Sequence, residues 1–452
     1  MGSRPNLLLV FADQMLAGMT GAEGHPQAIT PALDRLVGEG VLLDRCISNV
    51  PVCCPMRGSM WTGVWPTRHG VVSNDLPVRT DLPTLGTSLR QAGYRTGYVG
   101  KWHLDGVPRR KFTPPGKRRL GFDDFWAAFN CAHDYFNPRY FRDTPALQTV
   151  PGYEPTVQTD LALRFLQSRD DRPFALVVSY GPPHDPYAQV PQPYRDLYDP
   201  ATITLSGNVR HPIDNPLARG LDCRQVHADY LAAVTALDAE LARLLDALTA
   251  SNASEHTHVV FTSDHGDMLW SHGWMKKQSP YDESVRVPMI ARGPGIAAGS
   301  RTGELVSLVD LMPTLPGLLD LPIPDQLHGR DCSDVLRRRS EGRDAVLIGN
   351  LHSCDEAAMQ GMPEWRGLRT RAHTYVERRP GVPWLLFDDR ADPLQQTNLS
   401  DDPRHASLRA SLSARLAKEL ADHDDPFVPG EALMARMGLS EAWQHRDAHL
   451  ND

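Results

Sequence analysis

Short apolar runs alternate with stretches of helical spacing through the first three quarters of the chain. The run at 7–12 is apolar throughout and ends in polar residues, which is typical of a strand buried in a parallel sheet. Further strands are predicted at 94–100, 174–180, 258–261 and 285–290. Helices are predicted from Thr30-Pro31 onward and at 84–92, 157–167, 225–249 and 307–321. This alternation predicts an α/β fold in which helices flank a mostly parallel central sheet.

The pattern changes near residue 345. Segments 375–377 and 384–387 have the character of short antiparallel strands, and 408–421 has helical spacing. We therefore predict two units, a catalytic α/β domain at 1–345 and a smaller C-terminal α+β subdomain at 346–452. The polar tail from Asp424 is expected to lie over the body or over a neighbouring subunit, which leaves a homo-oligomer open.

Composition and charge narrow the class of protein. The chain has 452 residues, of which 41% are hydrophobic and 23% charged, as in ordinary globular proteins. The net charge is -8 and no long basic run occurs, which argues against a nucleic-acid partner. No apolar run reaches the ~18 residues of a membrane span, and the run at 7–12 lacks the features of a signal peptide. The seven cysteines show neither zinc spacing nor a disulfide-dense pattern, so we expect a cytoplasmic protein.

Oxygen and nitrogen ligands follow two of the predicted strands. Asp13 and Gln14 follow the first strand, and Asp264 and His265 follow the strand at 258–261. Ligands of open α/β sheets bind at the carboxyl ends of the strands. Carboxylate and amide oxygens suit Ca²⁺, Mg²⁺ or Mn²⁺, and the imidazole favours Mn²⁺ or another borderline metal. Each residue alone is more often a loop cap, but their shared position predicts one divalent cation.

Basic residues follow two further strands. Lys101 and His103 come after the strand at 94–100, His184 comes after the strand at 174–180, and Lys277 lies beyond the second acidic pair. Such side chains can bind the oxygens of a sulfuryl or phosphoryl group, and histidine can transfer protons near neutral pH. A single lysine is usually a solvated surface charge, so the position at the strand ends carries the interpretation.

The segment Cys53-Cys54-Pro55-Met56-Arg57 precedes a run of small residues and Thr62-Gly63. Pro55 favours an extended Cys54, which suits a short loop that ends where a helix begins. Cys53 and Arg57 could then face one anion pocket at the helix N-terminus. Taken alone, the segment is equally compatible with a buried pair of thiols beside a surface arginine.

This C-x-P-x-R pattern resembles the signature of type I sulfatases, which belong to the alkaline-phosphatase-like superfamily. Other segments resemble the same family: the opening strand at 4–14, the second signature at 93–104, a histidine loop at 183–186, the second metal loop at 263–268 with its lysine, and a C-terminal strand and turn at 386–399. The resemblance implies an alkaline-phosphatase-like fold and hydrolysis of aryl or carbohydrate sulfate monoesters to an alcohol and inorganic sulfate.

The resemblance also implies a modified residue and specific roles. Cys53 would be oxidised to formylglycine by a formylglycine-generating enzyme, and the hydrated aldehyde would attack sulfur beside a divalent cation, in this family most often Ca²⁺. Arg57 would hold the diol, His184 would protonate the leaving oxygen, and His103 would accept the proton of the second hydroxyl. The implied catalytic residues are Cys53, Arg57, Lys101, His103, His184 and Lys277. The implied metal ligands are Asp13, Gln14, Cys53, Asp264 and His265.

Two departures keep alternatives open. Many sulfatases have Asp-Asp and Asp-Asn where this chain has Asp13-Gln14 and Asp264-His265, and the latter pairs resemble the choline-sulfatase and phosphonate-monoester-hydrolase branches. A phosphonate monoester or phosphodiester hydrolase on the same site is therefore the first alternative, although Lys101-x-His103 is of the sulfatase type. The second alternative is a non-catalytic protein that binds anions or metals through an unmodified Cys53.

The substrate is expected to contact residues 105–150, which are predicted to be irregular and carry both basic and aromatic side chains. Such side chains could bind a sulfated sugar or an aryl group, and a packed lid is equally compatible with them. His133 in this segment and Asn74 after the turn at 69–70 are candidate substrate-binding residues. A turn-stabilising role is the alternative for Asn74.

Overall fold

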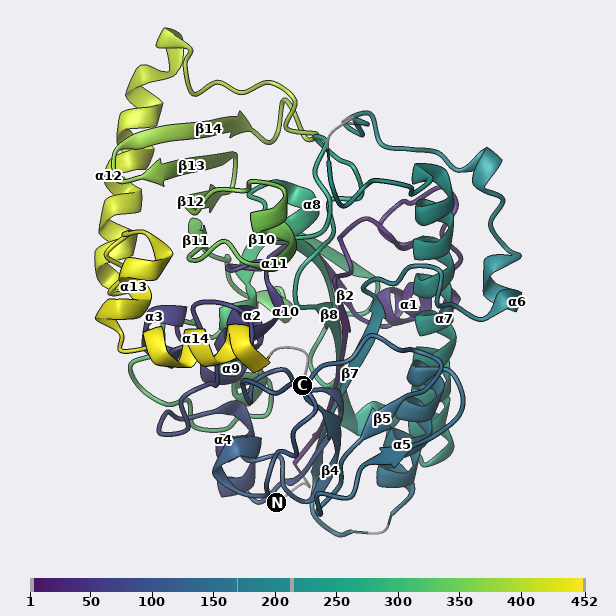
Figure 1. Cartoon of the computed structure of the whole chain (residues 1–452). Helices are drawn as coiled ribbons and strands as arrows, with labels where there is room; N and C mark the ends of the chain where they lie inside the picture. The colour runs from purple at the N-terminus through teal and green to yellow at the C-terminus, as the bar shows by residue number, and fades with distance from the viewer. Residues whose placement is uncertain (1–3, 169, 212–214, 450–452) are drawn as a thin grey trace.

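The computed structural model describes residues 4–168, 170–211 and 215–449. Its centre is an eight-stranded sheet in the order β10-β2-β9-β8-β1-β7-β3-β4 (Figure 1). The central strand β1 (Asn6–Asp13) is parallel to both neighbours, β7 (Phe174–Pro183) and β8 (Thr257–Ser263). β9 (Arg286–Arg292) is antiparallel to both of its neighbours. The predicted mostly parallel sheet is therefore confirmed.

Helices cover both faces of this sheet. α1 (Pro31–Gly38), α5 (Glu154–Gln167) and α7 (Cys223–Ala250) lie on one face. α2 (Cys53–Thr62), α4 (Leu85–Gln91) and α9 (Leu311–Leu318) lie on the other (Figure 1). Alternate side chains of β1 enter the two cores: Leu7, Leu9 and Phe11 pack with the second set of helices, and Leu8, Val10 and Ala12 with the first. Because both faces are covered, the strand needs apolar residues at every position.

Several elements were not predicted or differ in extent. β2 (Val41–Ile47) and β10 (Ser300–Ser307) extend the sheet at one edge, and their charged positions hid the strand pattern. β4 (Phe125–Phe129) crosses the stretch at 105–150 that was predicted to be irregular, so that prediction is wrong there. β3 (Arg95–Lys101) matches the predicted strand. The helix predicted at 307–321 is a 3₁₀ turn followed by the shorter α9.

The C-terminal region forms a second, antiparallel sheet in the order β11-β12-β13-β14, as the pattern predicted. Its strands are β11 (Ala345–Asn350), β12 (Trp365–Thr370), β13 (His373–Arg379) and β14 (Val382–Asp388). α12 (Ala406–Asp422) packs against this sheet. The division at residue 345 remains a prediction, because apolar residues of both sheets belong to one continuous core.

The remaining elements are short. They are α3 (Pro66–His69), β5 (Arg139–Tyr140), β6 (Gln148–Thr149), α6 (Gln192–Arg195), α8 (Asp282–Val285), α10 (Ser333–Leu336), α11 (Asp355–Met359), α13 (Gly430–Arg436) and α14 (Ser440–His449). The described part of the tail, with α13 and α14, packs on the body of its own chain (Figure 1). Within the described ranges, every helix is too short or too polar to cross a membrane.

A buried ion pair ties the tail to the body. The Arg366 guanidinium donates to Asp425 through Nε at 2.6 Å and Nη2 at 3.2 Å, and both side chains are fully buried. The Asp425 carboxylate also accepts from Nε1 of Trp65 at 3.0 Å. Removing one member of such a pair leaves an uncompensated charge in the interior, which costs far more than losing an exposed pair.

We expect Asp425→Ala to lower the free energy of unfolding by about 3–5 kcal/mol, because the Arg366 guanidinium is left buried without its anion. Denaturant unfolding followed by circular dichroism measures the loss. The matched control is Asp422→Ala, which removes an exposed partner of Lys418 at the end of α12 and should leave the midpoint unchanged. Equal losses in the two variants would contradict the argument.

Candidate active site

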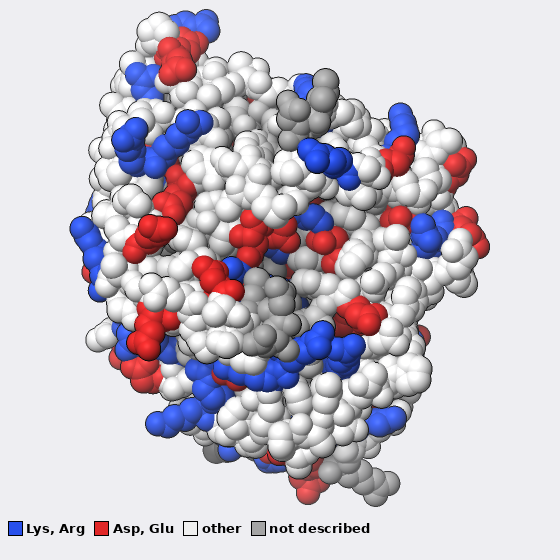
Figure 2. All heavy atoms as spheres, viewed as in Figure 1, with Lys and Arg blue, Asp and Glu red and all other residues white. Residues whose placement is uncertain are grey.

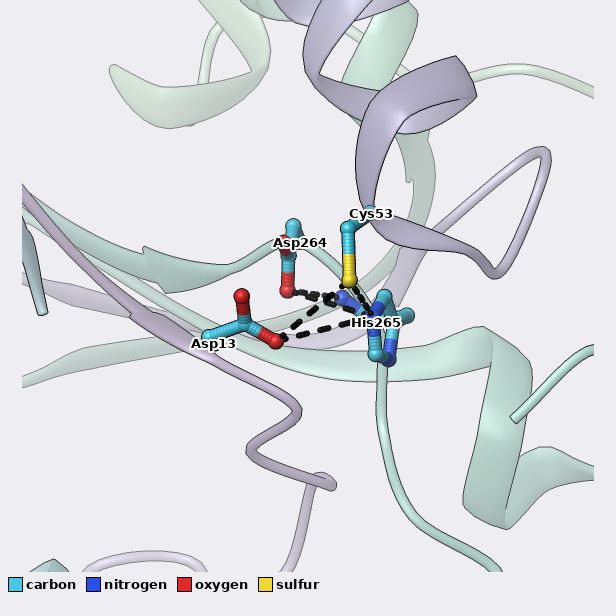
Figure 3. A group of neighbouring side chains, drawn as sticks. All are labelled: Asp13, Cys53, Asp264 and His265. Atoms are coloured by element: carbon cyan, nitrogen blue, oxygen red, sulfur yellow. Dashed lines mark hydrogen bonds and ion pairs between the residues drawn. The ribbon is translucent and has the colours of Figure 1, made fainter. Parts of the chain in front are cut away.

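Four buried side chains from three elements converge at the carboxyl edge of the central sheet. Asp13 is the last residue of β1, Asp264 and His265 follow β8, and Cys53 is the first residue of α2. Their ligand atoms all lie within 4.8 Å of one another. Figure 3 shows the four side chains pointing toward one another, with Sγ of Cys53 3.2 Å from Nε2 of His265 and 3.7 Å from Oδ1 of Asp13.

Arg57 lies one helical turn after Cys53 and binds both carboxylates. Its Nη2 donates to Asp13 at 3.0 Å and its Nε donates to Asp264 at 2.9 Å. Its Nη1 donates to the carbonyl oxygen of Lys101 at 2.8 Å and to Oγ of Ser179 at 2.9 Å. Burial raises the pKa of Asp13, but the cations of Lys101 and Arg57 outweigh burial and hold that pKa well below its ordinary value. The Asp13 carboxylate is therefore ionised although it is buried.

The arrangement around these carboxylates fits a divalent cation. Nδ1 of His265 donates to the carbonyl oxygen of Gly266 at 3.0 Å, and its Nε2 lies 3.7 Å from an oxygen of Asp13 and 3.7 Å from an oxygen of Asp264. A second hydrogen bond of this kind is typical of metal-binding histidines. Two carboxylates and one imidazole are a donor set that Ca²⁺ or Mn²⁺ accepts.

Gln14 lies beside this group, and its backbone adopts the left-handed conformation, with φ at 67°. Its Oε1 accepts from Nζ of Lys277 at 3.1 Å, and its Nε2 donates to Asp267 at 2.6 Å. Its backbone N–H donates to Oδ1 of Asp264 at 3.1 Å. The amide is thus held at the edge of the group, and its role as a metal ligand remains a prediction.

Two lysines bring positive charge to position 53. Nζ of Lys101 is 2.6 Å from Oδ2 of Asp13 and 3.8 Å from Sγ of Cys53. Nζ of Lys277 is 3.4 Å from the same sulfur. Burial and Asp13 raise the pKa of the Cys53 thiol, but Lys101, Lys277 and His265 lower it to about 5. The surroundings of residue 53 therefore favour a negative charge.

The two histidines of the pocket lie face to face. The rings of His133 and His184 stack with centroids 4.3 Å apart and an interplanar angle of 12°. Nε2 of His184 is 2.7 Å from Nζ of Lys277, and Nε2 of His133 is 3.4 Å from Nζ of Lys101. Burial, Lys277 and His133 hold the pKa of His184 well below its ordinary value. His184 is thus a neutral imidazole whose Nε2 accepts a hydrogen bond from the Lys277 ammonium group.

His103 and Asn74 line the same pocket. Nε2 of His103 is 2.9 Å from Oδ1 of Asp75. Asn74 accepts from the backbone N–H of Cys54 at 3.1 Å and donates to Oδ2 of Asp355 at 3.0 Å. The pocket has a volume of about 300 Å³ and is lined by Cys53, Asn74, Lys101, His103, Arg109, His133, His184, Asp185, Lys277, Asp355, Glu356 and Met359. The structure therefore brings every residue predicted for the site into one region.

Some pocket residues were missed. Asp185 belongs to the histidine loop at 183–186, and Arg109 belongs to the basic stretch at 105–150. The sequence patterns therefore pointed to both segments, although neither residue was predicted for the site. Asp355, Glu356 and Met359 follow β11 and carry no motif. Other members of the 105–150 stretch are structural: Trp126 and Arg119 are buried, with the Arg119 guanidinium 4.9 Å from the Trp126 ring centroid.

Comparisons with known proteins agree with this geometry. The family model described as Sulfatase matches residues 5–321, and the model described as N-sulphoglucosamine sulphohydrolase, C-terminal, matches residues 270–422. The ulvan-active sulfatase of Formosa agariphila is 35% identical to this chain, over 94% of this chain and 83% of its own length.

Two solved structures share the fold at lower identity. The structure of BT4656 in complex with its substrate D-glucosamine-2-N,6-O-disulfate has a TM-score of 0.83 and 23% identity, and covers 94% of this chain and 99% of its own. The phosphonate monoester hydrolase of Agrobacterium radiobacter has a TM-score of 0.75 and 24% identity, over 93% and 96% of the two chains. Because the first family model spans every residue of the predicted metal and catalytic groups, and the Formosa relative aligns over nearly the whole chain, this chain belongs to the sulfatase family.

Proposed function

We propose that this sulfuric ester hydrolase acts on sulfate monoesters of carbohydrates, after oxidation of Cys53 to formylglycine. The observation that carries the proposal is the position of Cys53, whose sulfur lies between His265 at 3.2 Å and Nζ of Lys277 at 3.4 Å. Residue 53 thus faces the cation-binding group on one side and an ammonium group on the other. A sulfated glucosamine in the BT4656 complex and an ulvan-active relative support the choice of carbohydrate esters.

Asp13, Asp264 and His265, with Gln14 and residue 53 beside them, would hold the divalent cation. The oxygen ligands and the family favour Ca²⁺, and Mn²⁺ or Mg²⁺ are the alternatives. When bound, the cation supplies Lewis acidity that favours ionisation of a hydroxyl group of hydrated formylglycine.

The side chains around residue 53 bind and neutralise the sulfate group. Arg57 fixes the two carboxylates through separate nitrogens, so the metal ligands are oriented before a substrate arrives. Lys101 and Lys277 lie within 3.8 Å and 3.4 Å of the Cys53 sulfur, where they would contact the oxygens of a sulfuryl group bound at that position. Preorganised cations of this kind stabilise charge that develops in the transition state.

The leaving oxygen needs a proton, and we assign this proton transfer to the pair of His184 and Lys277. The two nitrogens are 2.7 Å apart, and Nδ1 of His184 is held by the carbonyl oxygen of Asp185 at 2.9 Å. The imidazole therefore keeps its orientation while a proton passes through Nε2. By the same family resemblance His103 accepts the proton of the second hydroxyl, with Asp75 fixing its ring.

A phosphonate monoester hydrolase is the second candidate. The pairs Asp13-Gln14 and Asp264-His265 are the feature that favours it, because they depart from the pattern of many sulfatases. Both reactions would use the same nucleophile and cation, so relative rates on matched aryl esters separate them.

We expect Cys53→Ala to abolish turnover of 4-nitrophenyl sulfate and of sulfated monosaccharides, because the nucleophile is lost. Enzyme co-expressed with a formylglycine-generating enzyme should hydrolyse the sulfate faster than an aryl phosphonate monoester. Mass spectrometry of the tryptic peptide 46–57 should find an aldehyde in place of the thiol. The control Cys223→Ala, in the distant helix α7, should keep full activity. An unmodified thiol in a fully active enzyme would refute the proposal.

Removal of the cation should lower both activity and the thermal unfolding temperature, because a cation that binds only the folded state stabilises it by RT ln(1 + [L]/Kd), about 2.7 kcal/mol at a hundredfold excess over Kd. Chelated protein should regain its melting temperature when Ca²⁺, Mn²⁺ or Mg²⁺ is added, and the most effective ion identifies the metal. The variant His265→Ala should lose this response, whereas His211→Ala, at an exposed position, should keep it. A melting temperature that no cation changes in the wild type argues against the site.

A further inference from the structure

The last described helix of the chain contributes to the wall of the active-site pocket. α14 (Ser440–His449) lies beyond residue 422, where the second of the matched family regions ends. In Figure 1 it crosses the front of the molecule, and it contacts α13. Arg446 is the residue of this helix that is buried, with 6% of its surface exposed.

Arg446 reaches two aspartates of the pocket region. Its Nη2 contacts Oδ1 of Asp355, which lines the pocket, and lies 3.5 Å from Oδ2 of Asp75. The other oxygen of Asp355 accepts from Asn74 at 3.0 Å. The Arg446 guanidinium is thus connected, through Asp355, to Asn74 and the pocket that contains Cys53. Figure 2 shows acidic and basic side chains gathered around a hollow on this face.

The two aspartates differ in how their charge is balanced. Asp75 is held by Arg109 through two bonds, at 2.8 Å and 2.7 Å, and by His103 at 2.9 Å. For Asp355, Arg446 is the cationic partner found within the described ranges. Glu356, next in the chain, lines the same pocket and adds a second carboxylate. Without Arg446, Asp355 would lose its ion pair, and the pocket wall would be more negative toward an anionic substrate.

Packing holds Arg446 in place. Its guanidinium lies 4.6 Å from the ring centroid of Trp443, and that ring packs edge-on against His352 at 4.6 Å. Nη1 of Arg446 is 3.0 Å from Asp447. A buried, stacked guanidinium loses little further conformational entropy when it forms its ion pairs. Its positive charge is therefore held in one position.

We propose that Arg446 is a positioning residue of the active site. It neutralises Asp355 and so lets the pocket bind the sulfate group of the substrate. The proposal rests on the proposed sulfatase function for its substrate. Arg446 acts through Asp355 and does not touch the reacting atoms, so its effect belongs to binding more than to the chemical step.

We expect Arg446→Gln to raise KM for 4-nitrophenyl sulfate by about tenfold, equivalent to about 1.4 kcal/mol of binding, with kcat little changed, because a carboxylate of the pocket wall loses its ion pair. Arg446→Lys, which keeps the charge, should retain most of the affinity. Inorganic sulfate, followed by isothermal titration calorimetry and as a competitive inhibitor, should lose affinity in parallel. The control is Arg436→Gln, an exposed arginine of α13.

The double variant Arg446→Gln/Asp355→Asn separates charge from structure. Neutralising Asp355 removes the unbalanced anion, so KM and sulfate affinity should return toward the wild-type values. A double variant as weak as Arg446→Gln, or an Arg446→Gln enzyme with wild-type KM and sulfate affinity, would overturn the inference. If the wild type hydrolyses no sulfate ester, the proposed function fails, and calorimetry with inorganic sulfate still decides the role of Arg446.

Discussion

The buried guanidinium of Arg57 is the interaction on which this site depends. It places one positive charge between the carboxylates of Asp13 and Asp264, and all three side chains are fully buried. Each buried ion costs several kcal/mol of desolvation, which only close pairing and complete hydrogen bonding can offset. Arg57 meets this demand with bonds to four groups on β1, β3, β7 and the loop after β8. The strand ends and the start of α2 are thereby fixed relative to one another.

This constraint explains how a chain with a net charge of -8 can bind an anion. The positive groups are concentrated where the strands end, with Lys101 and Lys277 on either side of residue 53. Lys101 forms an ion pair with Asp13 and Lys277 donates a hydrogen bond to the Gln14 amide oxygen, so both ammonium groups have partners inside the protein. Farther from residue 53, the Asp355 carboxylate of the pocket wall is paired with Arg446 of α14.

The sequence predicted the inner part of the site because that part obeys a simple rule of position. Asp13, Lys101, His184 and Asp264 each lie at or just beyond the end of an apolar run, and parallel strands bring such ends together. The sequence pattern did not predict β2, β4 and β10. Charged residues interrupt β2 and β10, and β4 lies within a stretch rich in basic residues. Asp355 and Arg446 had no such signal. Their meeting depends on the packing of Trp443 and the path of the tail, which local patterns do not encode.

The burial of Cys53 has a consequence for timing. Only 1% of its surface is exposed, and its sulfur is enclosed by side chains from β1, β3 and the loop after β8. A maturation enzyme that must grip the backbone on either side of residue 53 would find no access once α2 has docked. The proposed oxidation of Cys53 would therefore have to precede the packing of α2 against β8, which follows some two hundred residues later in the chain. Folding and the oxidation of Cys53 would then compete in each newly made molecule.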